Sequence, residues 1–429
     1  MHLPAHSRNR SSHDRRGALS TTVAVTMIAA ALFSGSASAA TKKKTPTTKR
    51  AAVTTAPATT SVATAAPTSA KPLKIGLVAP YSGVFGFYGP VMEAVMKLRF
   101  QQAPSMAGRT IDVVTEDDQS DPKSSLAKVK KLVEESKVNV IVCCVNGASS
   151  LAVAPYLADA GVPMIAPIPG PKGLEAFKTS FSIGFSPTEL GTPFGKYAYD
   201  KLKAKTAVIF ASDFVQGHLV MDAFKEGFTK AGGKIIGEIY PPLDNADYGP
   251  YLSKIGTDAH IVVSFFGGAD AVRAVKQADA AGLNIRNRWV GLGPLVTKLV
   301  LGNMGDAAVG IEAFFHYPED GIETPGNKEF LAALEGKVPN TPPRNFVQAN
   351  AFATATVIMA AAKTAGPSPS GDELVKGLKG VNVQVPWGTL QFDPDTRYAV
   401  MNGYHYKVVK GANGALKHEI LGTFDGIKP

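Results

Sequence analysis

Aromatic and hydroxyl side chains gather in one short glycine-rich segment of this sequence. The segment YSGVFGFYG follows the apolar run 74–79 and carries Tyr81, Ser82, Phe85 and Tyr88. Glycines let backbone amides approach a ligand closely, and aromatic rings can wall an apolar pocket. The helix predicted to start near Pro90 should point its amide end at this segment, which favours a carboxylate or another anion. Hydroxyl groups can hydrogen-bond a carboxylate or a carbonyl. These residue types favour the binding of a small solute.

Other polar and aromatic side chains stand at or just beyond the ends of further apolar runs. They are Asn146, Ser149, Ser150, Gln216 and Phe266. Asn146 and the serines can donate to a carboxylate, and the start of the next helix adds backbone amides. Two alternatives stay open: the serines as ordinary helix N-caps, and Phe266 as a core residue.

Motifs of catalysis are missing from the sequence. It holds no GxxxxGK[ST] loop, no HExxH helix and no GxSxG turn, and its histidines show no ligand spacing. We therefore expect no catalytic residue, no metal and no cofactor. The adjacent pair Cys143 and Cys144 is interpreted as two small apolar residues that end a buried strand, because neighbouring cysteines can close only a strained ring.

A dinucleotide-dependent enzyme remains a remote alternative. The acids Glu116, Asp117 and Asp118 end the second predicted strand, where a ribose-binding acid would stand. Against it, the glycines of the first loop are spaced GxxGxxG instead of GxGxxG, and bulky aromatics would block close approach to a pyrophosphate.

The elements that must position these residues alternate from residue 72 onward. Strands are predicted at 74–79, 110–118, 139–145 and 162–167, with helices at 90–103, 122–136 and 149–161. A second strand–helix series begins near residue 187, and strand-like segments return at the C-terminus. The pattern predicts an α/β protein with two mostly parallel sheets flanked by helices. Ligands bind such sheets beyond the carboxyl ends of their strands.

Charge is concentrated in the first 70 residues. The net charge of +10 comes from 45 basic and 35 acidic residues, and nine of the basic residues with one acid lie within residues 1–70. The remainder is nearly neutral, which argues against a nucleic-acid partner.

The first 71 residues predict export. A basic start, an apolar run at 18–33 and the small residues Ala37-Ser38-Ala39 are typical of a signal peptide over residues 1–40, with an uncleaved anchor as the alternative. Residues 41–71 are rich in Thr, Ala and Pro and predict a disordered tether. We expect a protein of the periplasm or cell surface, soluble after signal cleavage.

The stretch KIGLVAPYSGVFGFYG resembles the start of the leucine/isoleucine/valine-binding family of type I periplasmic solute-binding proteins. The segments DDQSDPKSSLAKVKKLV, YGPYLSKI and VRAVKQADAAGL support the resemblance in order and spacing. It implies a Venus-flytrap fold with three hinge crossings, lobe 1 being residues 72–186 plus 316–386 and lobe 2 residues 187–315 plus 387–429. It also implies a monomer that delivers a small solute to the membrane subunits of an ABC permease. A ligand-sensing domain for a signalling receptor is the alternative.

Residue by residue, the resemblance carries over only in the first loop, at Tyr81, Ser82, Tyr88 and Gly89. A serine of the family falls at Gly147, the element after the fourth strand reads Ile168-Pro169-Gly170-Pro171, and a family Tyr-Gly is Gln216-Gly217. The acid that pairs with the ammonium of an amino acid falls near Gly293. A buried ammonium without an acid is costly. We therefore predict an aromatic or apolar carboxylate or amide as ligand, instead of a free α-amino acid.

Overall fold

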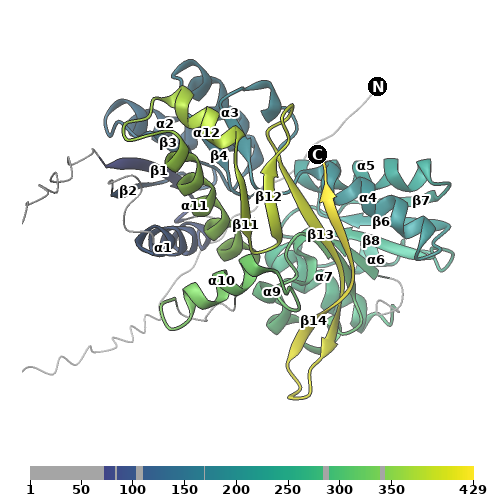
Figure 1. Ribbon diagram of the computed structural model, residues 1–429. Helices are drawn as coiled ribbons and strands as arrows, with labels where there is room; N and C mark the ends of the chain where they lie inside the picture. The colour runs from purple at the N-terminus through teal and green to yellow at the C-terminus, as the bar shows by residue number, and fades with distance from the viewer. Residues whose placement is uncertain (1–71, 83–84, 103–109, 169, 284–288, 339–343) are drawn as a thin grey trace, which may run out of the picture. The chain divides into compact units, whose positions relative to one another are not determined.

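The computed structural model describes residues 72–82, 85–102, 110–168, 170–283, 289–338 and 344–429 (Figure 1). The predicted signal peptide and tether lie outside these residues, as do Gly83 and Pro169.

A parallel sheet forms the first part of the described chain. Within the described residues its five strands run in the order β2-β1-β3-β4-β5. The strands are β1 (Leu73–Ala79), β2 (Ile111–Asp117), β3 (Val140–Val142), β4 (Met164–Ala166) and β5 (Ser180–Ser182). The buried run predicted at 139–145 is a strand only over residues 140–142.

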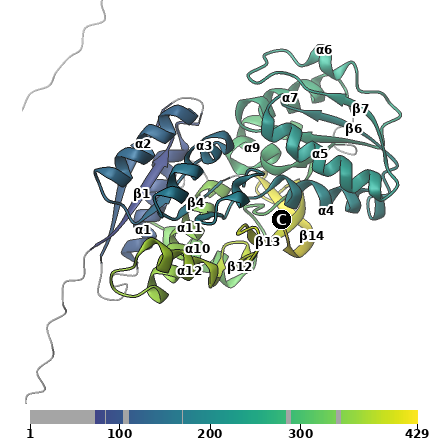
Figure 2. The ribbon, with the colours of Figure 1, turned by 90° about the horizontal axis from the view of Figure 1, so that it is seen from above.

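Helices cover both faces of this sheet because successive strand residues point to opposite sides. Ile75 and Leu77 pack into the cluster that contains α1, whereas Val78 and Ile141 pack with α2 and α3. The helices on these faces are α1 (Tyr88–Gln101), α2 (Pro122–Glu134), α3 (Gly147–Asp159), α11 (Phe346–Thr364) and α12 (Gly371–Lys379). Figures 1 and 2 both show α1 and α2 on opposite sides of β1.

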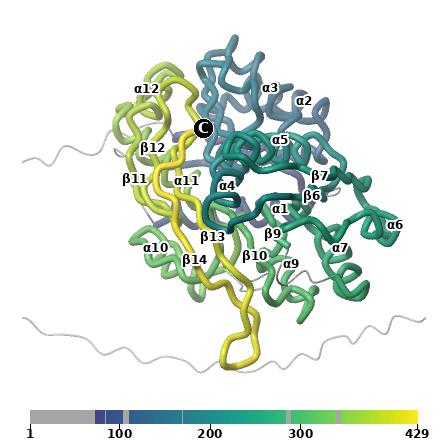
Figure 3. Tube along the Cα trace, turned by 90° about the vertical axis from the view of Figure 1, so that its right-hand side faces the viewer, coloured from purple at the N-terminus to yellow at the C-terminus, as the bar shows by residue number. Residues whose placement is uncertain are grey.

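The second sheet is half parallel and half antiparallel. Nine strands of the described chain run in the order β11-β12-β13-β10-β9-β8-β6-β7, with β14 paired to β13. The strands β6 to β10 pair in parallel, and β11 to β14 pair antiparallel. The bounds are β6 (Thr206–Ala211), β7 (Lys234–Ile239), β8 (Ile261–Phe265), β9 (Trp289–Leu292), β10 (Glu312–Phe315), β11 (Asn382–Val385), β12 (Gly388–Phe392), β13 (Ala399–Lys410) and β14 (Leu416–Ile427). Figure 3 shows β13 and β14 as one long antiparallel hairpin.

Helices also lie on both faces of the parallel half of the second sheet (Figures 1 and 2). The helices are α4 (Pro187–Asp200), α5 (Val215–Lys230), α6 (Gly249–Leu252), α7 (Gly268–Ala280) and α9 (Lys298–Met304), with single 3₁₀ turns η2 (Gly293–Val296) and η3 (Gly305–Ala308). Helix α10 (Pro325–Leu334) packs instead against β11, β12 and α1, and the 3₁₀ turn η1 (Leu174–Ala176) packs against β5. Helix α4 is started by a capping box in which Ser186 and Glu189 satisfy each other's backbone amides. Helix α4 crosses α5 very closely, because a Cβ on Gly227 would overlap the carbonyl oxygen of Thr192.

The chain passes more than once between the first sheet with its helices and the second sheet with its helices. It leaves β5 through residues 183–186 to reach α4, returns after β10 to reach α10, and passes from α12 into β11. The predicted boundary between residues 386 and 387 lies in the turn that joins β11 to β12. This is the two-lobe α/β architecture that the sequence predicts.

Candidate functional site

The predicted site residues all lie near carboxyl ends of parallel strands. Tyr81 and Ser82 follow β1, Asn146 and the two serines follow β3, Gln216 follows β6, and Phe266 follows β8. They therefore come from both sheets, at the edges where α/β proteins bind ligands.

The hydroxyl groups of the first loop are already hydrogen-bonded within the protein. Tyr81 donates its hydroxyl to Glu93 at 2.7 Å, and Ser82 donates to Asp117 at 2.7 Å. Asp117 also accepts the backbone amide of Tyr81 at 2.9 Å. Burial, with the Glu93 carboxylate, raises the pKa of Tyr81 well above its usual value. These contacts shape the loop, so neither hydroxyl is a free donor for a solute.

The aromatic side chains of the loop divide into exposed and packed ones. Phe85 and Phe87 are 37% and 46% exposed. Tyr88 lies against both, with ring centroids 5.8 Å from Phe85 and 4.4 Å from Phe87. Its ring also meets Phe346, at the start of α11, at 6.3 Å. The loop therefore offers apolar surface anchored by Tyr88.

The expectation that the first helix aims free amides at an anion is wrong. Helix α1 begins at Tyr88, two residues before its predicted start near Pro90. The amide of Tyr88 donates to Phe85 and that of Gly89 donates to Pro80, both at 2.9 Å. Pro90 has no amide hydrogen. The tight closure of the loop thus uses the donors that a carboxylate would need.

The helix after β3 is capped by Asn146. Its side chain accepts the amide of Ala148 at 2.9 Å and donates to the carbonyl of Ser120 at 3.2 Å. Ser150 is fully buried, accepts the amide of Cys144 at 3.3 Å and donates to the carbonyl of Asn146 at 3.4 Å. Asn146 and Ser150 therefore hold the loop together.

Two predicted residues carry buried polar atoms without a partner among the described residues. They are the hydroxyl of Ser149, in the first turn of α3, and the side-chain nitrogen of Gln216, in the first turn of α5. A buried polar group without a hydrogen bond is costly. Eleven other side-chain atoms of the described residues share this state, so the two donors stand out by their place just beyond the carboxyl ends of parallel strands. These two donors, one after β3 and one after β6, are the best candidates to hold an oxygen-bearing group of a solute.

Sequence reasoning missed Ser120 as a polar candidate. It follows β2, has a left-handed φ of 62°, and its buried hydroxyl has no partner among the described residues. Its carbonyl accepts from Asn146, so it lies beside the start of α3. The signal available in the sequence was its place in the segment DDQSDP, directly after a strand.

Phe266 lies in the core, which is the second of the two alternatives that the sequence left open for it. Its side chain is fully buried and packs against Phe210 at 4.9 Å and Tyr248 at 5.8 Å between ring centroids. The apolar run that contains it is buried on both faces, so the last residue of the run faces the core and not a pocket.

The interpretation of Cys143 and Cys144 as unbridged residues is also wrong. Both are fully buried, as predicted, but they form a disulfide with each other. The prediction rested on the usual separation of bridged Cα atoms, whereas these two Cα atoms lie 3.1 Å apart. The sulfurs lie within 4.8 Å of the Asp118 carboxylate. Bonded to each other, the sulfurs do not serve as thiolate metal ligands.

The three acids at the end of β2 are occupied by protein groups. Glu116 pairs with Lys128 at 2.9 Å and with Lys131 at 2.6 Å. Asp117 accepts from the first loop, and the buried Asp118 accepts from the hydroxyl of Ser125 at 3.0 Å. Burial raises the pKa of Asp118. These contacts use the carboxylate oxygens that would accept hydrogen bonds from a ribose, which weakens the dinucleotide alternative.

The position where the family places an ammonium-binding acid cannot easily carry a side chain. Gly293 has a φ of +65°, and a Cβ there would lie 2.7 Å from the ring of Phe265. Three other acids, Glu189, Asp213 and Asp270, each contact another protein group, although one buried carboxylate oxygen of Glu189 has no partner among the described residues. Glu189 closes the capping box of α4, and burial raises its pKa to about 8. Asp270 pairs with Arg273, and the exposed Asp213 meets His218 at 2.8 Å.

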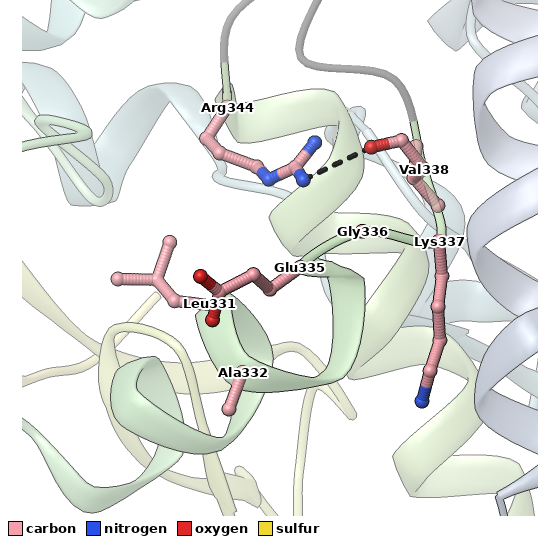
Figure 4. Close-up of a pocket in the computed structure, with 7 residues that line it drawn as sticks. All are labelled: Leu331, Ala332, Glu335, Gly336, Lys337, Val338 and Arg344. Atoms are coloured by element: carbon pink, nitrogen blue, oxygen red, sulfur yellow. Dashed lines mark hydrogen bonds between the residues drawn. The ribbon is translucent and has the colours of Figure 1, made fainter.

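A surface pocket of about 790 Å³ lies elsewhere, at the end of α10 (Figure 4). Leu331, Glu335 and Arg344 are among the residues that line it. The guanidinium of Arg344 donates to the carbonyls of Leu334 and Val338 at 3.0 and 3.1 Å. This pocket contains none of the predicted site residues, and its one arginine already binds the pocket wall.

Within the described parts of the chain, no helix combines the length and the apolar character that crossing a membrane requires.

Comparisons with known proteins agree with the fold. The family model for periplasmic binding proteins matches residues 72–414. A Leu/Ile/Val-binding protein homolog of Brucella suis is 26% identical over 369 residues, which cover 82% of this chain and 92% of that protein.

Solved structures extend the similarity to ligand complexes. An ABC transporter substrate-binding protein from Sphaerobacter thermophilus is similar with a TM-score of 0.79 and 26% identity, over 83% of this chain and 98% of the other. A solute-binding protein of an ABC transporter from Rhodopseudomonas palustris, solved with 3,4-dihydroxybenzoic acid, gives a TM-score of 0.76 and 28% identity over the same shares. The chain therefore belongs to the periplasmic binding protein family, in the leucine/isoleucine/valine-binding group of type I solute-binding proteins.

Proposed function

We propose that the protein captures a small aromatic carboxylate of the benzoate class outside the cytoplasm and delivers it to an ABC permease. The observation that carries the proposal is the pair of unpartnered buried donors, the Ser149 hydroxyl and the Gln216 amide. Each follows a strand of a different sheet, so one carboxylate held by both would join the two lobes. Hydrogen bonds to a charged acceptor are stronger than those between neutral groups.

The body of the solute is proposed to rest on the first loop. Phe85 and Tyr88 supply apolar and aromatic surface there, and stacking on such a ring contributes about 0.5–1.5 kcal/mol beyond burial. The relative from Rhodopseudomonas palustris, solved with a dihydroxybenzoic acid, supports this solute class. We propose the lobe division given above, 72–186 plus 316–386 and 187–315 plus 387–429, for the closing motion.

A branched-chain amino acid is the second candidate, because the Brucella relative is named a Leu/Ile/Val-binding protein homolog. Such a solute would bring an ammonium group that needs an acid. Asp213 is the nearest acid along the chain to Gln216, but it already meets His218. Gly293 offers no side chain. Both observations favour the carboxylate without an ammonium.

A thermal-shift panel distinguishes the two candidates. We expect benzoate and 4-hydroxybenzoate to raise the melting temperature, because a ligand that binds only the folded state stabilises it by about 2.7 kcal/mol at 100 times its Kd. Benzamide tests the need for the charge, and leucine and valine test the ammonium. Shifts with leucine and valine, and none with the benzoates, would assign the amino-acid ligand instead.

A further inference from the structure

Glu319 is a fully buried carboxylate in the segment that leads from β10 to α10. Its backbone has a left-handed φ of 64°, which residues with a side chain seldom adopt. The segment runs from the second sheet to a helix that contacts α1, on the first sheet. The carboxylate thus lies in a connection between the two parts of the fold.

The two oxygens of Glu319 accept hydrogen bonds from the first residues of two different helices. The amide of Lys298, which starts α9, donates to one oxygen at 2.5 Å. The amide of Phe346, which starts α11, donates to the other at 3.1 Å. First-turn amides have no acceptor within their own helix, so the carboxylate satisfies one open donor on each.

These two helices belong to the two parts of the fold from which the candidate site residues come. Helix α9 follows β9 and the turn at Gly293, in the second sheet. Helix α11 packs against α1, and its first residue, Phe346, lies against Tyr88 of the first loop. A shift of the start of α11 relative to α9 would therefore move the ring against which Tyr88 of the candidate site lies.

We propose that Glu319 is a positioning residue for solute binding: one ionised carboxylate fixes the starts of α9 and α11 relative to each other, and its protonation releases one of them. An ionised carboxylate accepts at both oxygens, whereas a protonated carboxyl has one oxygen that carries the hydrogen. The protonation of Glu319 can be followed without a solute, so this proposal can be tested independently of the proposed function.

The groups around Glu319 determine when it titrates. Lys298 and Asp320 face it, and the ring of His418 on β14 lies 4.0 Å from its carboxylate. The hydroxyls of Tyr317 and Tyr406 also face Glu319, and Arg344 faces Tyr317. Burial raises the pKa of Glu319 to about 8, against the two amide hydrogen bonds, which lower it. Burial lowers the pKa of His418 to about 4, so the two groups titrate far apart.

Distances between spin labels on the two lobes, measured without solute at pH 6.5 and pH 9, test the proposal. Labels are attached through Lys123→Cys on α2 and Asp222→Cys on α5, which are exposed positions. The native cysteines are bonded to each other and do not react. In the wild type, the distance distribution is expected to change with a midpoint near pH 8.

Glu319→Gln keeps the shape of the side chain but can accept only one amide, so its distribution should match the wild type at pH 6.5 at both pH values. Glu323→Gln is the matched control, because Glu323 lies in the same segment, is 82% exposed and pairs only with Lys328 among the described residues. The distance distribution of Glu323→Gln should change with pH as that of the wild type does. A wild-type distribution that does not change with pH would overturn the proposal, as would a pH-dependent Glu319→Gln variant. If Glu319→Gln does not fold, the wild-type titration still decides.

Discussion

Replacing Ser149 with alanine is expected to weaken benzoate binding by about 10- to 100-fold without destabilising the ligand-free protein. The hydroxyl of Ser149 is fully buried and has no partner among the described residues. A hydrogen bond to a charged group contributes about 1.5–3 kcal/mol, and each 1.4 kcal/mol is a factor of ten in Kd. In the ligand-free protein the same hydroxyl carries an uncompensated desolvation cost, so its removal leaves the free energy of unfolding unchanged or higher. Calorimetric titration gives the Kd for benzoate, and thermal melting gives the stability of the ligand-free protein.

The matched control is Ser150→Ala, one residue further along α3. Ser150 is equally buried, but its hydroxyl bonds the backbone at Cys144 and Asn146. Its loss should lower the free energy of unfolding by about 1 kcal/mol and leave the Kd for benzoate nearly unchanged. If Ser149→Ala destabilises the protein and keeps its affinity, Ser149 is a structural residue and the site has been placed wrongly.

Gly184→Ala is expected to cost about 3 kcal/mol of folding stability, at the upper end of the usual cost of overpacking. Gly184 lies between β5 and α4, in the first passage between the two sheets. A Cβ at this position would overlap the carbonyl oxygen of Ile168, which follows β4. Backbone must move to make room, because a main-chain carbonyl cannot rotate away as the end of a flexible side chain can. Chemical denaturation measures the cost.

Gly302→Ala is the comparison variant for Gly184→Ala. Gly302 lies inside α9, and a Cβ there meets nothing within 4 Å. Alanine is favoured over glycine in a helix by about 0.5–1 kcal/mol, so this variant should be more stable than the wild type. Equal stability of the two variants would show that the passage at Gly184 is not tightly packed.

The sequence allowed the elements to be predicted because their signals are local. Apolar runs of strand length and the pair Asp121-Pro122 at the start of α2 mark the elements without reference to distant residues. The positions beyond the strand ends follow from the topology of parallel sheets. This is why Ser149 and Gln216 could be named as candidates.

The details that were left open or predicted wrongly depend on contacts between distant residues or on exact backbone angles. The first loop closes by hydrogen bonds from Tyr88 and Gly89 to Phe85 and Pro80, and no spacing rule shows that these amides are used. Phe266 sits in a run buried on both faces, where alternation does not distinguish the core from the pocket. The orphaned hydroxyl of Ser120 depends on a left-handed backbone angle.

A crystal structure of the protein grown with benzoate tests the central claim most directly. The account predicts one carboxylate whose oxygens lie within about 3.2 Å of both the Ser149 hydroxyl and the Gln216 side-chain nitrogen, with the ring against Tyr88 or Phe85. A carboxylate bound away from both donors would contradict it, as would a site that holds only leucine, with the ammonium on Asp213.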